Sequence, residues 1–335
     1  MDQVSLYQQD LSRVVQQLSF PQCGNILVTG ATGLIGGCLV DILMQHSKLQ
    51  VYAMGRNRLR AEHRFKAYQN DERFHFVEHD VCQPLALDTD FHYIIHAASN
   101  ASPNFFKQSP VEVMKSNLNG LSFLVEYGLQ HQMKRMVYVS SGEIYGEGDG
   151  GVFTEKSSGY IDILSPRSCY PSSKRAAETL CAAYCQEYGT EIVIARPCHT
   201  YGPYFTESDN RVYAQFIRNV LNGEDIVMKS KGEQYRSWLY VADCAAALLM
   251  LLMKGVSGEA YNVADSQSNI TIRQLAEQVA SIGGQQVVLD IDEQQGNTTP
   301  ITRAVFATDK LNSLGWAPRF GIEEGLQHTV EIMKH

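Results

Sequence analysis

The chain has 335 residues, of which 44% are hydrophobic and 19% are charged. This balance is ordinary for a globular protein and excludes a chain that is disordered throughout. The formal net charge of −8 argues against a general nucleic-acid-binding protein, because neutralising phosphates requires a basic surface. A few converging arginines can still hold one anionic ligand, so the charge does not exclude a phosphate-bearing substrate.

Residues 1–22 predict a short amphipathic N-terminal helix that lies outside the main domain. They contain acidic residues and glutamines but no apolar core segment, so they are not a secretory signal. The longest strongly apolar run, residues 244–253, is roughly half as long as a membrane span. The eight cysteines are scattered and lack the spacing of zinc ligands. We therefore expect a soluble cytoplasmic protein with free thiols, no metal, and no membrane or nucleic-acid partner.

Short apolar runs alternate with helical patterns from residue 25 onward. The runs predict strands at residues 25–29, 51–54, 74–78, 93–96, 135–140 and 191–195. The helical patterns cover residues 34–44, 111–130, 170–188 and 272–282, and the last begins with a capping box of Thr271 and Gln274. This alternation predicts βαβ units. The expected fold class is α/β, with a Rossmann-type doubly wound parallel sheet and a smaller mixed α/β lobe.

A glycine-rich turn joins the first predicted strand to the first helix of this sheet. Residues 29–36 read Thr-Gly-Ala-Thr-Gly-Leu-Ile-Gly, with glycines at Gly30, Gly33 and Gly36. These glycines permit a tight turn and a close backbone approach, so the helix N-terminus can bind a pyrophosphate. The motif predicts a dinucleotide site that also includes Thr32, Leu34 and Ile35.

The end of the second predicted strand bears on the choice of dinucleotide. An acidic residue there would bind the adenosine ribose of NAD, but this chain has Gly55 followed by Arg56. Arg56 either accepts the 2′-phosphate of NADP or stacks on the adenine, so both cofactors stay open. Asp80 and Val81, after the third strand, are expected to contact the adenine edge.

A tyrosine and a lysine share one face of the helix predicted at residues 170–188. Tyr170 and Lys174 are four residues apart, and Ser141 lies upstream at the end of a strand. An ammonium group beside a phenol favours the phenolate, so this pairing predicts a lowered pKa for Tyr170 and a role as general base.

Together these motifs resemble the extended short-chain dehydrogenase/reductase family of nucleotide-sugar epimerases and dehydratases. The resemblance covers nearly the whole chain and includes residues 96–98, 117, 137–141, 196–197, 201–203, 236–243 and 314–316. It implies that Tyr170 is the base, Lys174 its partner and ribose anchor, and Ser141 the hydroxyl that orients the sugar O4 proton. The further NAD contacts that it implies are Ala97, Ala98, Ser99, Asn117, Tyr170, Lys174 and Pro197.

The subtype within this family depends on the two residues after Ser141, which here are Gly142 and Glu143. Sugar 4,6-dehydratases carry an Asp-Glu pair, in which the Asp protonates the departing hydroxyl. Simple 4-epimerases lack the Glu, and UDP-glucuronate decarboxylases carry Ser-Glu. Glycine at position 142 has no proton to donate, which weakens the dehydratase interpretation.

Several other segments are similar to those of UDP-glucuronate decarboxylases. Residues 101–103, with Ser102, resemble their substrate loop, and residues 166–170 resemble the segment that enters their catalytic helix. By this similarity Arg211 falls in a diphosphate-binding stretch. Arg303 falls where these enzymes place an arginine beside the substrate carboxylate, and Arg236 is expected to help neutralise these anions. Gly142 departs from the decarboxylase pattern. His199 also departs from this pattern, because it replaces an Asn. We expect His199 to contact the sugar or the diphosphate, and we expect Glu143 to be a further substrate-binding residue.

The expected function is that of an NAD-dependent nucleotide-sugar lyase that acts through a 4-keto intermediate, most similar to UDP-glucuronate decarboxylase. The alternatives are an NDP-hexose 4,6-dehydratase, then a 4-epimerase. A non-catalytic NAD(P)-sensing protein is disfavoured because Ser141, Tyr170 and Lys174 are retained. We expect residues 23–194 to form the NAD(P)-binding domain and residues 195–335 mainly a nucleotide-sugar-binding lobe, with some chain returning to the first domain. The resemblance also suggests a homodimer that packs the helices of Asn117 and Tyr170.

Overall fold

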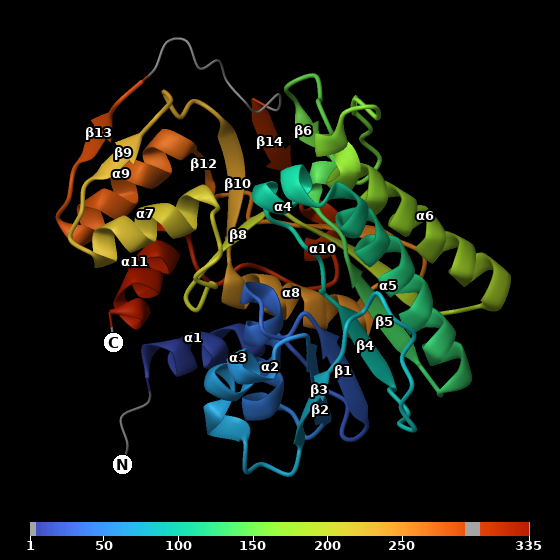
Figure 1. Cartoon of the computed structure of the whole chain (residues 1–335). Coiled ribbons are helices and arrows are strands. Elements are labelled where there is room, and N and C mark those ends of the chain that lie inside the picture. Colours follow the sequence, from blue (N-terminus) through green and yellow to red (C-terminus); the bar gives the residue numbers. More distant parts are fainter. Residues whose placement is uncertain (1–4, 292–301, 335) are drawn as a thin grey trace.

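Seven parallel strands form the central sheet of the molecule (Figure 1). The computed structural model describes residues 5–291 and 302–334. The strand order is β11-β7-β5-β4-β1-β2-β3. These strands are β1 (Asn25–Thr29), β2 (Gln50–Gly55), β3 (Phe74–Glu78), β4 (Tyr93–His96), β5 (Arg135–Val139), β7 (Ile192–Pro197) and β11 (Ala260–Val263). The predicted doubly wound Rossmann-type sheet is therefore confirmed, and its order reverses between β1 and β4, where such sheets bind ligands.

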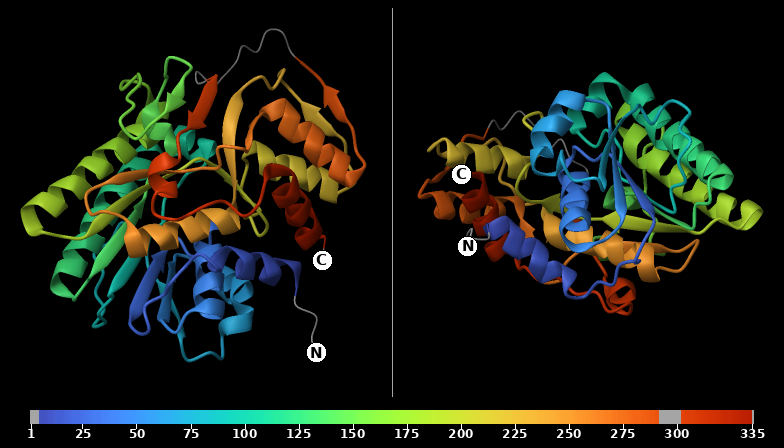
Figure 2. Two further views of the ribbon diagram at one scale, coloured as in Figure 1. Left: turned by 180° about the vertical axis from the view of Figure 1, so that it is seen from behind. Right: turned by 90° about the horizontal axis from the view of Figure 1, so that it is seen from below.

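Helices cover both faces of this sheet, because its strands are apolar on both sides. On strand β1, Ile26 and Val28 belong to the core shared with α2 (Leu34–His46) and α8 (Val241–Lys254). Leu27, between them, belongs to the core shared with α5 (Pro110–Gln130) and α6 (Cys169–Tyr188). Figure 2 shows the same layers from behind and from below.

Two elements of the sheet domain come from the second half of the chain. Strand β11 pairs with β7 at the edge of the sheet, and α8 packs against α2, β5 and β7. The sequence patterns predict neither element, although they predict that some chain returns to the first domain. Strand β7 runs to Pro197, just beyond the expected boundary at residue 194.

The smaller lobe has its own mixed sheet of five strands. Strands β12 (Asn269–Thr271), β10 (Tyr235–Tyr240), β14 (Arg303–Phe306) and β6 (Val152–Phe153) follow one another, and β8 (His199–Tyr201) pairs with β10. A second sheet pairs β9 (Ile226–Met228) with β13 (Val287–Leu289). The helices of this part are α7 (Val212–Leu221), α9 (Ile272–Gly283) and α11 (Ile322–Met333), whereas α10 (Asp309–Asn312) packs against β11 of the central sheet. The capping box predicted at Thr271 and Gln274 is present at the start of α9.

Helix α1 (Leu6–Val15) is amphipathic as the sequence predicts, but it does not lie outside the main domain. Its apolar face buries Leu11 and Val14 against α2, α8 and α11 (Figure 1). Asp10 accepts a 2.7 Å hydrogen bond from Tyr240 and lies 2.9 Å from Nδ1 of His328. The helix therefore joins the sheet domain to the smaller lobe.

Shorter helical segments complete the described part of the chain. They are α3 (Arg58–Arg64), α4 (Pro103–Gln108), η1 (Lys66–Tyr68), η2 (Gly142–Tyr145) and η3 (Pro166–Ser168). Within residues 5–291 and 302–334, no helix is both long and apolar enough to cross a membrane. The same residues contain no cluster of side chains suited to holding a metal ion.

Candidate active site

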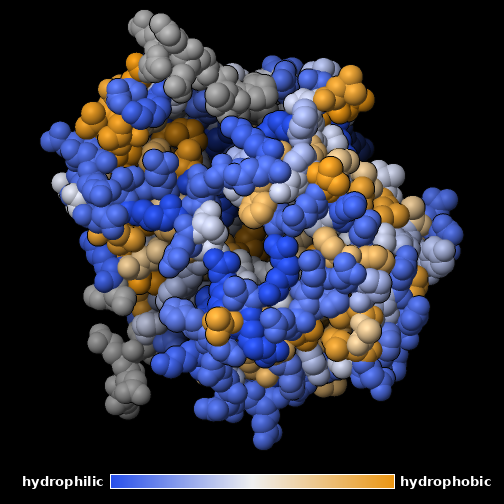
Figure 3. Space-filling view, viewed as in Figure 1, coloured by the Kyte–Doolittle hydropathy of each residue, from blue (hydrophilic) through white to orange (hydrophobic). Residues whose placement is uncertain are grey.

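A cavity of about 630 Å³ lies between the carboxyl ends of the parallel strands and the smaller lobe. The sheet side contributes residues after β4 and β5 and at the end of β7, while the lobe contributes His199, Arg211 and Arg236. Figure 3 shows that the molecule is hollowed near the middle of one face, with hydrophilic residues around the hollow. The position at the switch in strand order is the usual ligand site of this fold.

The glycine-rich turn after β1 has the geometry that a dinucleotide requires. Gly30 has a φ of +67°, and a Cβ atom on it would lie 2.9 Å from the backbone oxygen of Ala97. A Cβ atom on Gly36 would lie 2.3 Å from the oxygen of Gly30. Gly33 is the N-cap of α2 and offers no side-chain cap. The first turn of α2 therefore presents bare backbone N–H groups, which fits the pyrophosphate of NAD.

The expected cofactor residues on the sheet side gather near this turn. Ile35, Ala97 and Ser99 line the cavity, as does Pro197 at the end of β7. The backbone N–H of Ala98 donates a 3.1 Å hydrogen bond to the Thr29 hydroxyl, which fixes the loop after β4.

Asn117 links the loop after β4 to helix α6 without itself lining the cavity. Its Oδ1 accepts a 2.8 Å hydrogen bond from Ser99, and its Nδ2 donates a 2.9 Å hydrogen bond to Ser173 on α6. Because Ser99 lines the cavity, Asn117 positions a cavity residue rather than contacting the cavity itself.

The residues predicted for the adenine end of the site lie outside the lining of the cavity. Nη1 of Arg56 lies 3.4 Å from Glu112 and its Nη2 lies 3.4 Å from Asn100, so the guanidinium points across to α5. Asp80 accepts a 2.9 Å hydrogen bond from the backbone N–H of Cys82, and Val81 packs against Gly120.

Tyr170, Lys174 and Ser141 lie together at the cavity wall. The ring of Tyr170 stacks on Phe106 at a centroid distance of 4.7 Å. The Lys174 ammonium lies 5.8 Å from the centre of the Tyr170 ring, and burial lowers the pKa of Lys174 to about 7.

The sequence predicts a lowered pKa for Tyr170, and the structure differs on this point. Burial, followed by the charge of the nearby Glu143 carboxylate, raises the pKa of Tyr170 to about 12. A hydrogen bond with Ser141 and the charges of Arg211 and Arg167 lower the pKa, but burial outweighs them. Spacing along a helix reveals the neighbouring lysine but not how deeply both groups are buried.

Glu143 faces the cavity beside an arginine that the sequence analysis did not single out. Nη2 of Arg167 donates a 3.0 Å hydrogen bond to its carboxylate, and the guanidinium lies 4.7 Å from the centre of the Phe106 ring. Arg167 also lines the cavity. The sequence feature that could have identified Arg167 is its position just before α6, within residues 166–170, which resemble a segment of the decarboxylases.

On the lobe side, two arginines and a histidine form a basic wall. Asp209 holds Arg211, whose Nε donates a 2.9 Å hydrogen bond to the carboxylate. Nη1 of Arg236, a buried residue, donates a 3.0 Å hydrogen bond to the backbone oxygen of Tyr235. His199 is exposed at the start of β8, and loss of solvation in the cavity, followed by the charges of Arg236 and Arg211, lowers the pKa of its imidazole. His199 is therefore neutral at physiological pH and available as a hydrogen-bonding group.

Two predicted substrate residues do not line the cavity. The Ser102 hydroxyl donates a 2.9 Å hydrogen bond to Asn210. Arg303 alternates along β14 with Ala304 and Phe306, which line the cavity, and its guanidinium lies 4.9 Å from the centre of the Tyr235 ring. Successive side chains on a strand point to opposite faces, so Arg303 lies on the far face of β14.

A segment without any recognisable motif also contributes to the cavity wall. Tyr160, Ile161, Asp162 and Ser165 line it and come from the irregular chain between β6 and η3. No sequence pattern pointed to these residues, because a loop has no periodicity to reveal which side chains face a site.

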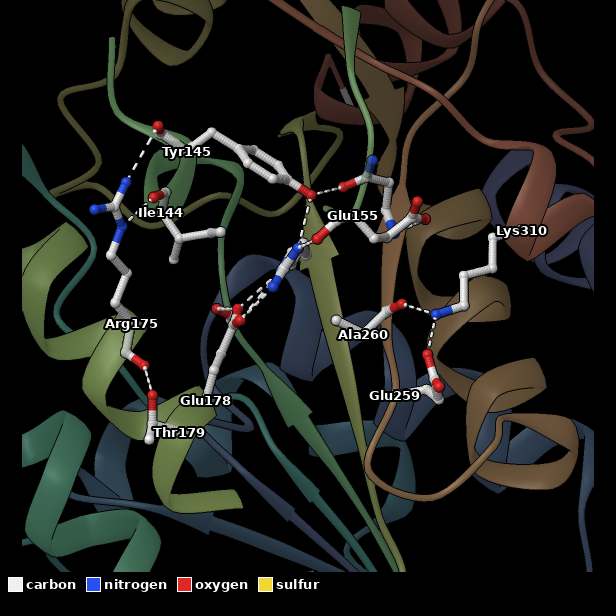
Figure 4. Close-up of polar contacts among 12 residues, drawn as sticks. Ile144, Tyr145, Glu155, Arg175, Glu178, Thr179, Glu259, Ala260 and Lys310 are labelled. Carbon is white, nitrogen blue, oxygen red and sulfur yellow. Dashed lines mark hydrogen bonds and ion pairs between the residues drawn. The ribbon is translucent and has the colours of Figure 1, made fainter. Parts of the chain in front are cut away.

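A buried polar network that includes side chains of α6 holds the residues that follow β5 (Figure 4). Glu178 accepts hydrogen bonds from Nε of Arg196 at 3.0 Å and from the Ser140 hydroxyl at 2.5 Å. Nη1 of Arg196 donates a 2.9 Å hydrogen bond to the Tyr145 hydroxyl. Nε of Arg175 donates a 2.5 Å hydrogen bond to the backbone oxygen of Ile144. The segment that carries Ser141 and Glu143 is thus fixed from two sides.

Comparison with known proteins places this fold and site in one family. The family model of the NAD-dependent epimerases/dehydratases matches residues 26–264, so the chain belongs to that family. The chain is 35% identical over 302 residues to UDP-glucuronic acid decarboxylase 6 of Arabidopsis thaliana, which covers 90% of this chain and 86% of the relative.

Solved structures agree with this assignment. UDP-glucose 4-epimerase from Thermotoga maritima, solved with UDP-glucose, has a TM-score of 0.79 and 25% identity, covering 92% of this chain and 98% of that one. The dTDP-glucose 4,6-dehydratase from Bacillus anthracis, solved with NAD, has a TM-score of 0.78 and 26% identity, covering 92% and 96%. The family to which the chain belongs is NAD-dependent, in agreement with the NAD that the sequence predicts beside the open alternative of NADP.

Proposed function

We propose that this protein is an NAD-dependent decarboxylase of a nucleotide-linked uronic acid, of the UDP-glucuronate type. The observation that carries the proposal is the cavity wall at residues 141–143. Ser141 and Glu143 face the cavity beside Tyr170, while Gly142 between them supplies no proton donor. The similarity to UDP-glucuronic acid decarboxylases of plants and vertebrates at 30–35% identity supports the same activity.

The cofactor half of the site is assigned to the glycine-rich turn and its surroundings. We assign the pyrophosphate to the turn of Gly30, Gly33 and Gly36. We assign the ribose to Tyr170 and Lys174. The remaining predicted contacts are Thr32, Leu34, Ile35, Arg56, Asp80, Val81, Ala97, Ala98, Ser99, Asn117 and Pro197. NAD supplies a reversible two-electron oxidation of the sugar at C4.

The chain's own residues move the proton and stabilise the charge of the reaction. Tyr170 accepts the proton of the 4-hydroxyl as the phenolate, which the positive charge of bound NAD+ would favour against the burial that raises its pKa, with Ser141 orienting that hydroxyl. The resulting 4-ketone makes the C5 carboxylate a β-keto acid. The C5–C6 bond then breaks, CO2 leaves, and the electron pair moves onto O4. There the Ser141 hydroxyl and the protonated Tyr170 stabilise the negative charge by hydrogen bonds.

The lobe side of the cavity fits the anionic part of such a substrate. Arg211 and Arg236 supply two positive charges, and neutral His199 supplies a hydrogen-bonding group beside them. We assign the diphosphate to this wall, residues 23–194 mainly to the cofactor domain, and residues 195–335 mainly to the substrate lobe. In this proposal Ser102 and Arg303 lie outside the cavity wall and do not contact the substrate directly.

Quaternary structure and location are part of the same proposal. We propose a cytoplasmic homodimer that packs α5 and α6 of two copies against each other. In support, α5 exposes apolar side chains at Val111, Met114 and Leu129, and α6 exposes Tyr188 near its end. These side chains are spread along the two helices, so the proposal rests on them together with the family resemblance.

The test is to incubate the NAD-loaded protein separately with UDP-glucuronate, UDP-glucose and dTDP-glucose and to measure the masses of the products. We expect loss of CO2 from UDP-glucuronate and unchanged masses for the two neutral sugars. Loss of water from a hexose would instead show a 4,6-dehydratase. A changed retention time without a change in mass would show a 4-epimerase.

A further inference from the structure

Gly142 and Phe306 meet at the cavity wall from opposite parts of the fold. Gly142 begins η2 after the central sheet, and Phe306 ends β14 of the smaller lobe. A Cβ atom on Gly142 would lie 2.5 Å from Cζ and 2.8 Å from Cε1 of the Phe306 ring. Carbon atoms in contact are separated by about 3.5–4 Å. The ring therefore occupies the space that any side chain at position 142 would need.

Aromatic packing holds the Phe306 ring in this place. The side chain is 2% exposed, and its ring centre lies 5.7 Å from that of Tyr145 and 5.9 Å from that of Phe153. Tyr145 and Phe153 stack on each other at 4.8 Å with nearly parallel rings. The Tyr145 hydroxyl is itself held by a 2.5 Å hydrogen bond to Asn262. The ring cannot rotate away without disturbing this buried cluster.

The backbone at Gly142 is held equally firmly. Nη2 of Arg175 donates a 3.2 Å hydrogen bond to the backbone oxygen of Tyr145 (Figure 4). It donates a second one, of 2.9 Å, to the backbone oxygen of Gly159. At the other end of the segment, the N–H of Glu143 donates a 3.1 Å hydrogen bond to the Ser141 hydroxyl. Because both sides are fixed, neither can yield to a side chain at position 142.

We infer that Phe306 is a specificity-determining residue that closes position 142 to a proton donor and turns this part of the sugar site into an apolar wall. The inference rests on the proposed function. Ser141 and Glu143 flank Gly142, so a sugar whose O4 meets Ser141 and Tyr170 places its C5 substituent against this wall.

Loss of water and loss of CO2 differ in whether the wall beside the C5 substituent must supply a proton. Elimination of water removes the C5 proton, breaks the C6–O bond and requires a proton on the departing oxygen. Decarboxylation breaks the C5–C6 bond and releases neutral CO2, so its leaving group needs no proton. An apolar ring beside the substituent disfavours a charged carboxylate relative to CO2. Phe306 thus favours loss of CO2 and opposes loss of water.

The experiment compares Gly142→Asp, Phe306→Ala and the double variant as NAD-loaded proteins. It measures their melting temperatures and the product masses from UDP-glucuronate, UDP-glucose and dTDP-glucose. Gly142→Asp alone should melt at a lower temperature and remove water from a hexose only at the background rate of the assay. The double variant should recover part of the lost stability and remove water from a hexose about tenfold faster than either single variant.

A matched control separates this effect from a general loss of packing. Phe320 is also 2% exposed but packs against Tyr240 in another part of the molecule, so Phe320→Ala should not rescue Gly142→Asp. The inference would be overturned if Gly142→Asp and the double variant Gly142→Asp/Phe306→Ala had equal melting temperatures and removed water equally fast. If the wild-type protein releases no CO2 but the double variant still shows the rescue and the gain in water loss, the proposed function fails while the role of Phe306 stands.

Discussion

The Lys174 ammonium donates a 2.8 Å hydrogen bond to the backbone oxygen of Val139, the last residue of β5. Its Nζ atom also lies 4.7 Å from the centre of the Tyr138 ring on the same strand. The lysine of the catalytic helix is therefore tied to the strand that leads into Ser141. Its charge is held in the protein interior, which has consequences for stability and for catalysis.

Replacing Lys174 by Met should abolish activity and yet stabilise the ligand-free protein near neutral pH. Burial lowers the pKa of Lys174 from 10.5 to about 7. Below pH 7 both folded and unfolded chains carry the proton, and the folded chain bears the full cost of burying the charge. Between pH 7 and about 10.5 the unfolded state binds more protons, so the unfolding free energy rises with pH.

Denaturant unfolding at pH 6.5 and pH 9.5 checks this prediction. Lys174→Met should be more stable than the wild type at pH 6.5, by on the order of 4 kcal/mol, with a smaller difference at pH 9.5. Lys115→Met, which replaces an exposed lysine on α5, should show no such trend. A difference between Lys174→Met and the wild type that does not change with pH would contradict the prediction.

Replacing Tyr170 by Phe should reduce turnover by about a thousandfold or more because the proton acceptor is lost, while NAD stays bound through Lys174 and the glycine-rich turn. Single-turnover assays and the amount of NAD that copurifies measure the two effects. Tyr138→Phe is the matched control. Within the described part of the chain the buried Tyr138 hydroxyl has no hydrogen-bond partner, so its removal should preserve both activity and stability. Full activity of Tyr170→Phe would disprove its assignment as the base.

The sequence predicted the sheet and many of the residues that the structure brings to the cavity wall, because both depend on local patterns. Strand and helix periods, the glycine spacing and the Tyr170–Lys174 pair all lie within short stretches of chain. What it could not predict depends on how distant segments meet. The contact of Phe306 with Gly142 and the orientation of Arg303 on β14 arise from tertiary packing, and the raised pKa of Tyr170 depends on burial.

Replacing Arg167 by Ala should impair turnover of UDP-glucuronate more than replacing Arg303 by Ala. Arg167 lines the cavity and donates to Glu143, whereas the Arg303 side chain lies on the far face of β14. Loss of a charge-assisted contact in the cavity should cost about 10–100-fold in kcat/KM. Steady-state kinetics of both variants check the order. A larger loss for Arg303→Ala would restore the carboxylate role that the sequence suggested for it.

Replacing Glu178 by Gln should destabilise the protein by about 3–5 kcal/mol, because it leaves the buried Arg196 guanidinium without its charged partner. The two side chains are 10% and 11% exposed and are joined at 2.6 Å. Thr179→Ala, at the neighbouring exposed position in Figure 4, should change the unfolding free energy little.

The same Glu178→Gln variant should also change the pH dependence of catalysis. The Glu178 carboxylate raises the pKa of Lys174 against the larger opposing effect of burial. Without that negative charge the pKa of Lys174 falls further, and the lysine loses its proton at a lower pH than in the wild type. The alkaline decline of kcat/KM that comes from Lys174 should therefore move to lower pH. A profile that keeps its wild-type shape while stability falls would show that Glu178 supports only the fold.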